Sequence, residues 1–177
     1  MKSLGVVLLF AMVAVRGHAQ ERCDFDLRPP ASKPRIIASE PVSSRARVLE
    51  QPGSPVEIVA ADLSGLVLTL TDDGYSYHSE ALGSFEVRNR SDQQIQYVIV
   101  SLRVGSCRQI ASGGGIARPR RLDIPPGGTV RIETPFGSGG GITTDANPTG
   151  VFIWVSSVEL RNCIYQPAVA TSCALDQ

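Results

Sequence analysis

Four cysteines are the residues whose types and positions most directly indicate chemistry: Cys23, Cys107, Cys163 and Cys173. An even number of cysteines in an exported chain predicts two disulfides, and the sequence alone leaves three pairings open. We favour Cys107 with Cys163, because each follows the end of a long apolar strand, which leaves Cys23 with Cys173 to join the terminal segments. No C-x-x-C or paired Cys/His spacing is present, so structural disulfides are favoured over a zinc site or a reactive thiol.

Acid–base side chains form no catalytic pattern in the sequence. After signal cleavage His78 would be the single remaining histidine, which excludes a site with two imidazoles, and we interpret it as a surface or core-edge residue. Glutamates on the predicted strands alternate with apolar neighbours, which places them on solvated faces rather than in an acid–base pair: Glu57, Glu86, Glu133 and Glu159. We therefore expect no catalytic residue, and we expect the protein not to be an enzyme.

Sequence patterns for metal or cofactor binding are equally weak. Asp72 and Asp73, together with Asp145, could offer oxygen ligands to calcium, but they lack the regular spacing of a calcium loop, so we interpret them as turn residues. The run Gly137–Gly141 has no following lysine and no strand-to-helix context, so it fits neither a phosphate loop nor a nucleophile elbow. We expect no metal and no cofactor.

Arginine side chains provide the one local excess of charge, at Arg103, Arg108, Arg118, Arg120 and Arg121. Guanidinium groups bind carboxylates and phosphates with paired hydrogen bonds, so these residues could dock an acidic partner, although a solvated loop is the favoured interpretation. The full chain has seventeen basic and seventeen acidic residues, a balance that gives no footprint for nucleic acid.

The segment Phe136–Gly150 is glycine-rich and about fifteen residues long, which is unusual for a loop in a compact domain. Loops of this kind often carry function, so it is the best candidate for a functional or mobile loop. Together with the basic segment it gives the candidate partner-binding residues, which are Arg118, Arg120, Arg121 and Phe136.

The order of the chain predicts an exported protein with one folded domain. Residues 1–19 have the form of a signal peptide, with a basic start, an apolar run and a small-residue end. No later segment is apolar enough to span a membrane, so we expect a secreted or periplasmic protein with no membrane span after cleavage. A proline-rich extended arm follows at 20–55, then a β-domain at 56–166 and a tail at 167–177. Within the arm, Arg35–Ile37 and Val48–Leu49 could lie against the domain as short edge pieces.

Period-two alternation predicts the strands of this domain. One strand is expected at residues 85–90, where Phe85, Val87 and Asn89 form the dry face and Glu86, Arg88 and Arg90 the wet one. The turn after it predicts a hairpin with Tyr97–Val100. That second run is apolar on both faces, which indicates a central strand. The other strands are expected at Val56–Ala61, Leu66–Thr71, Tyr75–His78, Leu122–Ile124, Val130–Ile132 and Val151–Arg161.

The last of these strands also indicates a central position, with Phe152, Trp154, Val158 and Leu160 predicted to share one face. An Asp73–Gly74 turn predicts a hairpin between the strands expected at Leu66–Thr71 and Tyr75–His78. Helical periodicity is absent after the signal segment. The sequence therefore predicts an all-β protein, an antiparallel sandwich of seven or eight strands.

Three segments carry a resemblance to a known family: FEVRNRSDQQIQYVIVSL, LDIPPGGTVRI and VFIWVSSVEL. Together they resemble the immunoglobulin-like β-sandwich of exported bacterial proteins, in which an N-x-S turn separates two core strands and a proline–glycine turn precedes the next. The resemblance covers about Val56–Tyr165. It implies a fold rather than an activity.

These observations favour a non-enzymatic exported module that binds a partner or has a structural role in the cell envelope or the extracellular space. The expected partner is a protein or a glycan at the cell surface, bound through sheet edges and the Phe136–Gly150 loop. The alternative is a small secreted hydrolase or carbohydrate-active module, which would require two carboxylates about 5 to 9 Å apart in a cleft. A third hypothesis is an inhibitor that presents the glycine-rich loop rigidly.

Overall fold

A computed structural model describes residues 23–31, 33–71, 74–79, 82–105, 121–135 and 150–169. The predicted signal peptide lies outside these ranges. More than half of the described residues are in β-strands, and the helix α1 (Val42–Arg45) is a single turn. No helix within these ranges is long and apolar enough to cross a membrane.

The first sheet contains four strands in the order β1-β3-β6-β8. Their bounds are β1 Arg35–Ile37, β3 Val56–Asp62, β6 Leu82–Asn89 and β8 Thr129–Pro135. Strand β1 runs parallel to β3, whereas the β3–β6 and β6–β8 pairs are antiparallel. The predicted dry face of β6 is confirmed, because Phe85, Val87 and Asn89 are all fully buried.

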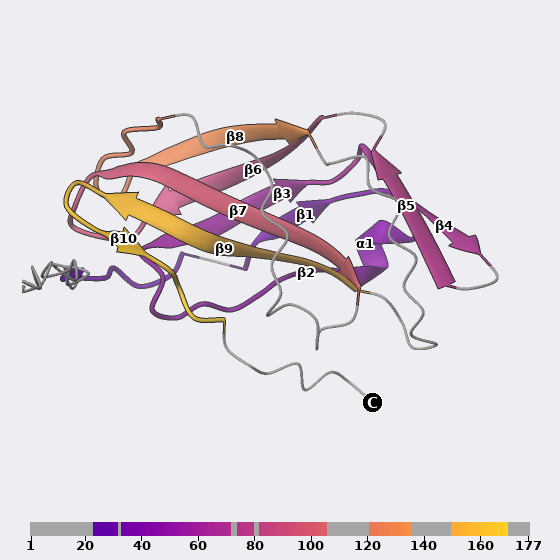
Figure 1. Ribbon diagram of the computed structural model, residues 1–177, viewed down its shortest axis with the longest axis horizontal. Helices are drawn as coiled ribbons and strands as arrows, with labels where there is room; N and C mark the ends of the chain where they lie inside the picture. The colour runs from indigo at the N-terminus through magenta and orange to yellow at the C-terminus, as the bar shows by residue number, and fades with distance from the viewer. Residues whose placement is uncertain are drawn as a thin grey trace, which may run out of the picture.

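The second sheet is centred on β9 (Gly150–Leu160), as the double-sided apolar pattern predicts. Strand β7 (Ile95–Gly105) pairs antiparallel with β9 along its whole length. The opposite edge of β9 takes β2 (Ala46–Val48) in parallel and then β10 (Ile164–Tyr165) antiparallel. Figure 1 shows the two sheets as two layers, with the N-terminal arm contributing a strand to each.

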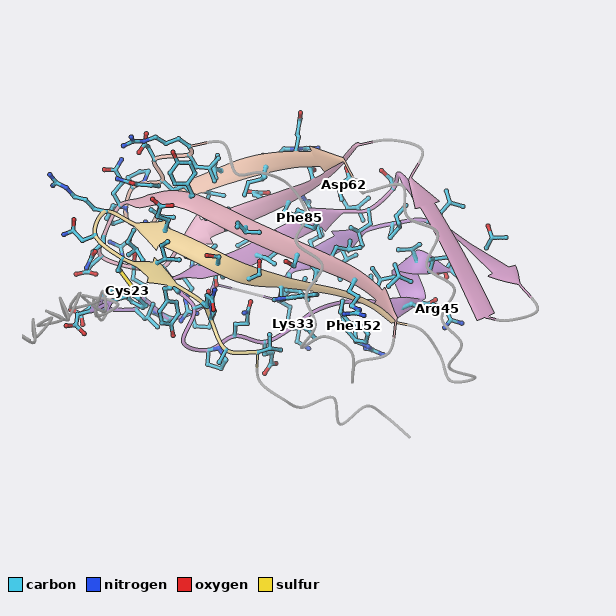
Figure 2. All side chains as sticks on the ribbon, viewed as in Figure 1. Cys23, Lys33, Arg45, Asp62, Phe85 and Phe152 are labelled. Atoms are coloured by element: carbon cyan, nitrogen blue, oxygen red, sulfur yellow. A yellow bond between two sulfur atoms is a disulfide. The ribbon has the colours of Figure 1, made fainter. Side chains whose placement is uncertain are left out.

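The core lies between the two layers and continues under a separate hairpin. Side chains from both sheets form one buried cluster, with Phe85 near its middle (Figure 2). The predicted hairpin is confirmed as β4 (Leu66–Thr71) and β5 (Gly74–Ser79), which lie at one end of the molecule in Figure 1. Leu66 and Val42 belong to the same cluster, so apolar burial anchors the hairpin and α1 to the sheets.

A β-bulge at Ser156 changes which residues of β9 face the core. Val100 of β7 pairs with Val155 and Ile99 pairs with Ser157, so one residue of β9 has no opposite partner. The Ser156 hydroxyl donates to the Ile99 carbonyl at 3.2 Å and accepts from the Ser101 hydroxyl at 2.9 Å. An extra residue reverses the alternation beyond it. The prediction that Phe152 and Trp154 share a face with Val158 and Leu160 is therefore wrong.

Several other strand predictions differ from the structure. Strands β6 and β7 do not form a hairpin: the turn after Asn89 carries the chain from one sheet to the other. Strand β7 is not central among the described strands, because beyond β9 it makes only a bridge from Ile95 to Ile124. The described chain contains ten strands rather than seven or eight, and two of the pairings are parallel. Strands β1 and β2 and the helix α1 belong to the arm, whereas β10 follows β9 near the end of the described chain.

The disulfide in the described chain joins Cys23 to Cys163. The favoured pairing of Cys107 with Cys163, and with it that of Cys23 with Cys173, is therefore wrong. Cys163 lies in the turn between β9 and β10, next to Cys23 at the start of the arm. The prediction used the positions of cysteines after apolar strands, and these positions do not determine which cysteines are neighbours in the fold. Cys107 and Cys173 lie outside the described residues. Both arm segments predicted as edge pieces are confirmed, as β1 and β2.

Candidate functional site

The N-terminal arm and β10 pair with successive parts of the edge of β9. Strand β2 pairs with Val151–Ile153, and the Leu49 N–H continues the ladder by donating to the Ile153 carbonyl at 2.8 Å. The Gln51 side chain then replaces a strand: its amide donates to the Val155 carbonyl at 2.8 Å and accepts from the Val155 N–H at 2.7 Å. Strand β10 pairs with Val158 and Glu159, so main-chain groups of this edge have partners in the arm and in β10.

The corresponding edge of β3 is covered only in part. Strand β1 pairs with Ala60–Asp62, and no described strand pairs with Val56–Val59 on the side away from β6. Upstream of β1 the arm contains Pro30 and Pro34, which have no N–H to donate to a ladder. The arm therefore departs from β3 here, and the Ala31 N–H contacts the Glu57 carboxylate instead, at 3.2 Å.

A cavity of about 480 Å³ lies between the arm and the two sheet edges. This volume is within the range of small-molecule sites. Its walls are mainly aliphatic and proline side chains, and charged groups occur at four positions. Figure 2 shows Lys33, one of these four, on the side of the molecule where the arm passes. The lining residues that matter for its chemistry are Pro30, Pro34, Val48, Val56, Ile58, Val155, Lys33, Glu50, Glu57 and Arg90.

Arg90 is the buried charge of this cavity. Only 7% of the residue is exposed, and the described part of the chain places no carboxylate oxygen within 4.0 Å of its guanidinium. Its acceptors are main-chain carbonyls: Nε donates to Arg28 at 2.9 Å, and Nη1 donates to Pro52 and Ser54 at 3.4 and 3.5 Å. The Nη1 bonds are long, since N–H···O bonds cluster near 2.9–3.0 Å.

The turn after β6 positions Arg90. Asn89 is fully buried, its Nδ2 donates to the Gln93 and Ile124 carbonyls, and its Oδ1 accepts from the Ser91 N–H and hydroxyl. The Arg90 main chain bonds to Pro55 on one side and Arg28 on the other. The sequence placed Arg90 on the wet face by extending the alternation of β6. The strand ends at Asn89, so that prediction is wrong.

Glu57 has its own partners within the cavity. Its Oε1 lies 2.5 Å from Arg88 Nε, although no hydrogen bond is directed at that oxygen, and its Oε2 accepts from the Ala31 N–H. The side chain is 12% exposed, so the sequence prediction of a solvated glutamate is wrong at this position. Glu57 therefore joins the arm to Arg88, and no carboxylate of the described residues pairs with Arg90.

The predicted partner-binding residues are not brought to this cavity by the described chain. Arg121 is exposed, and its Nε lies 2.9 Å from an Asp123 carboxylate oxygen. Arg118, Arg120 and Phe136 lie outside the described residues, as do the candidate calcium ligands and the glycine run. The described ranges contain no group of three or more His, Cys, Asp or Glu side chains that could hold a metal ion.

Two features of the sequence could have pointed to the cavity. Pro30 and Pro34 lie just before β1 in the arm, and they prevent the arm from continuing its pairing with the edge of β3. The polar residues Asn89, Arg90 and Ser91 follow a strand whose last inward position is already polar. That combination predicts a buried polar turn rather than a surface one, but it does not predict which cavity the turn will reach. Asn89-Arg90-Ser91 has the form of a glycosylation acceptor, but in the fold the Asn89 amide is buried and both of its N–H groups are hydrogen-bonded.

Comparisons of the whole chain with family models, with curated proteins and with solved structures gave no match.

Proposed function

We propose that this chain is an exported immunoglobulin-like binding module that holds a ligand in the cavity beneath its N-terminal arm and catalyses no reaction. The observation that carries the proposal is the cavity itself. Ordered elements from both sheets and the arm build its walls, and Arg90 is held in it by a fully hydrogen-bonded turn. A concave, mainly apolar site with a few positioned polar groups is the usual form of a small-molecule site.

The order of the strands supports the immunoglobulin-like part of the proposal. In that fold one sheet has the order A-B-E-D and the other contains C, F and G. Assigning β3, β6 and β8 to A, B and E, and β7, β9 and β10 to C, F and G, reproduces the pairing and direction of these six strands.

The disulfide supports export. A bond between Cys23 and Cys163 requires an oxidising compartment, which is the expected environment beyond a secretory signal. The finding that no described helix is able to cross a membrane is consistent with a periplasmic or extracellular protein. Mass spectrometry of material secreted by a host cell would test this part, because the mature chain should begin near Gln20 and retain the Cys23–Cys163 bond.

Binding can be tested by methyl NMR with a library of small molecules. Ligands that enter the cavity should shift the methyl signals of Val48, Val56, Ile58 and Val155 in a saturable way. The roof of the cavity is formed by the arm residues Pro30, Ala31, Lys33 and Pro34, and Ala31 is an exposed residue of this roof. Ala31→Trp should block the shifts, whereas Thr129→Trp on the exposed face of β8 should not. A library that shifts none of these signals in the unmodified protein would contradict the proposal.

One observation favours the alternative of a hydrolase: Glu50 and Glu57 line the same cavity. Two carboxylates in one cleft are the minimum for glycoside hydrolysis. The contacts of Glu57 with Arg88 and with the Ala31 N–H oppose this, since both keep its carboxylate engaged. Turnover of an aryl glycoside by purified protein, lost in Glu50→Gln, would favour the hydrolase over the binding module.

A further inference from the structure

We propose that the ligand of this cavity is a small organic acid with an apolar body, whose carboxylate pairs with Arg90. This inference rests on the proposed binding function and specifies the chemistry of the ligand.

The charge of Arg90 calls for an anion. A guanidinium has five N–H donors, and the described acceptors engage only Nε and Nη1, two of them at long range. Burying a cation is costly unless it is paired, and main-chain carbonyls carry only partial negative charge. A carboxylate would complete the fork geometry, because it accepts two parallel bonds from one guanidinium.

Neighbouring carboxylates do not fill this role. Glu57 is engaged by Arg88 and by the Ala31 N–H, and Glu50 is exposed to solvent. Lys33 is also an exposed residue of the cavity lining, so solvent screens its charge, and Arg90 is left as the buried cation that discriminates between ligands. The site is thus prepared for one negative charge, supplied from outside.

The remaining walls indicate an apolar body. Val56, Ile58 and Val155 contribute buried aliphatic surface, and the prolines of the arm contribute rings with no donor group. A sugar or a nucleotide would bring many hydroxyl or amide groups that such walls leave unpaired. An aliphatic or aromatic chain attached to a single carboxylate matches both parts of the site.

The roof of the cavity favours a free small molecule over a polypeptide. The arm is held at one end by the Cys23–Cys163 bond and at the other by β1. Between them it is joined to the sheets by main-chain bonds at Arg28 and by the contact of Ala31 with Glu57. An extended polypeptide would have to pass between the arm and the sheets, whereas a molecule of the size of octanoate needs only to enter the cavity.

The test uses the full mature protein and three ligands of equal chain length: octanoate, octanamide and octylamine. Isothermal titration should show octanoate binding at least about tenfold more tightly than octanamide, since a hydrogen-bonded charge adds at least that factor. Octylamine should bind more weakly still. Equal binding of octanoate and octanamide would overturn the inference and leave the binding function intact. No binding by any ligand in the methyl NMR test above would overturn both.

Variants at Arg90 separate charge from shape. Arg90→Lys should retain part of the preference for octanoate over octanamide, and Arg90→Gln should remove it, with circular dichroism to verify that each variant is folded. If Arg90→Gln does not fold, Arg90→Lys still decides, because a preference unchanged in Lys33→Gln but reduced in Arg90→Lys identifies Arg90. A preference lost in Lys33→Gln and kept in Arg90→Lys would contradict the assignment.

The chain's own C-terminal residues are the other source of a carboxylate, since the Pro167 carbonyl accepts from Gln51 at the cavity wall. Replacing Leu175 by Ser and Asp176 by Asn in the full chain should leave octanoate affinity unchanged. Affinity that rises several-fold in this variant would show that the C-terminal segment occupies the cavity, and would overturn the proposal of an external acid.

Discussion

The edges of β9 and β3 receive the same arm in opposite ways. On β9 successive parts of the edge are paired by β2, by the Gln51 amide and by β10. On β3 the ladder stops after three residues of β1, and the space beyond becomes a cavity. Both edges belong to one core, so the difference lies in the arm and not in the sheets.

This contrast shows how a short sequence difference converts an edge into a site. Around β2 the arm has N–H groups and a glutamine that imitates a peptide unit. Before β1 it has prolines, which cannot form a ladder. A covered edge prevents pairing with other chains. Where the arm departs from β3, it leaves room for a ligand without exposing a long strand edge. The predictions below test whether the two edges are as independent as this view requires.

The largest effect is expected from removing the disulfide, with Cys23 and Cys163 both changed to Ser. The bond closes a sequence separation of 140 residues, and its loss should lower the free energy of unfolding by about 2–5 kcal/mol. Urea denaturation measures this loss. If the edges are independent, hydrogen exchange should accelerate at the Ala31 N–H, in the roof, far more than at the Val155 N–H. Equal acceleration at both sites would show that the arm moves as one unit.

Gln51→Ala should break the other edge, with a loss of about 2 kcal/mol, because the N–H and carbonyl of Val155 are left without partners in a buried strand. Gln93→Ala is the matched control: its amide donates to the Asp24 carbonyl at an exposed position, so the loss should be well under 1 kcal/mol. Thermal and urea unfolding compare the two. A Gln51 variant as stable as the control would mean that water replaces the amide.

The sequence predicts the strands better than it predicts the edges and the site. Alternation identified β3, β4, β6 and β9, since each has a strong apolar face. It failed at Ser156, because a bulge depends on the partner strand. It also failed at Cys163 and Arg90, whose partners lie far away in the chain. The cavity results from contacts between the arm and β3, and no local pattern encodes such contacts.

Glu57→Ala should loosen the roof with only a small global cost. Its ion pair with Arg88 is partly exposed, so the loss of stability should be about 1 kcal/mol or less. Hydrogen exchange at the Ala31 N–H should accelerate, while the Gln51–Val155 contact should be unaffected. Glu133→Ala, an exposed glutamate of β8, serves as the control with no change at either place. Slower exchange at Ala31 would indicate that Glu57 holds the arm away from β3.

The smallest effect concerns pH, at the covered end of β3. The Ser64 hydroxyl and N–H both donate to Asp62 and lower the pKa of its carboxyl below the ordinary value of 3.8. A lowered folded-state pKa means that Asp62 stabilises the fold above the unfolded-state pKa, and that this contribution is lost as the pH falls through the folded-state value. Ser64→Ala should return the Asp62 pKa toward its ordinary value in an NMR titration, with a slight loss of stability at neutral pH. The neutral Gln51 contact should show no such dependence, so acid should loosen the β3 edge before the β9 edge. Simultaneous loosening of both edges in acid would instead place the acid-sensitive groups in the shared core.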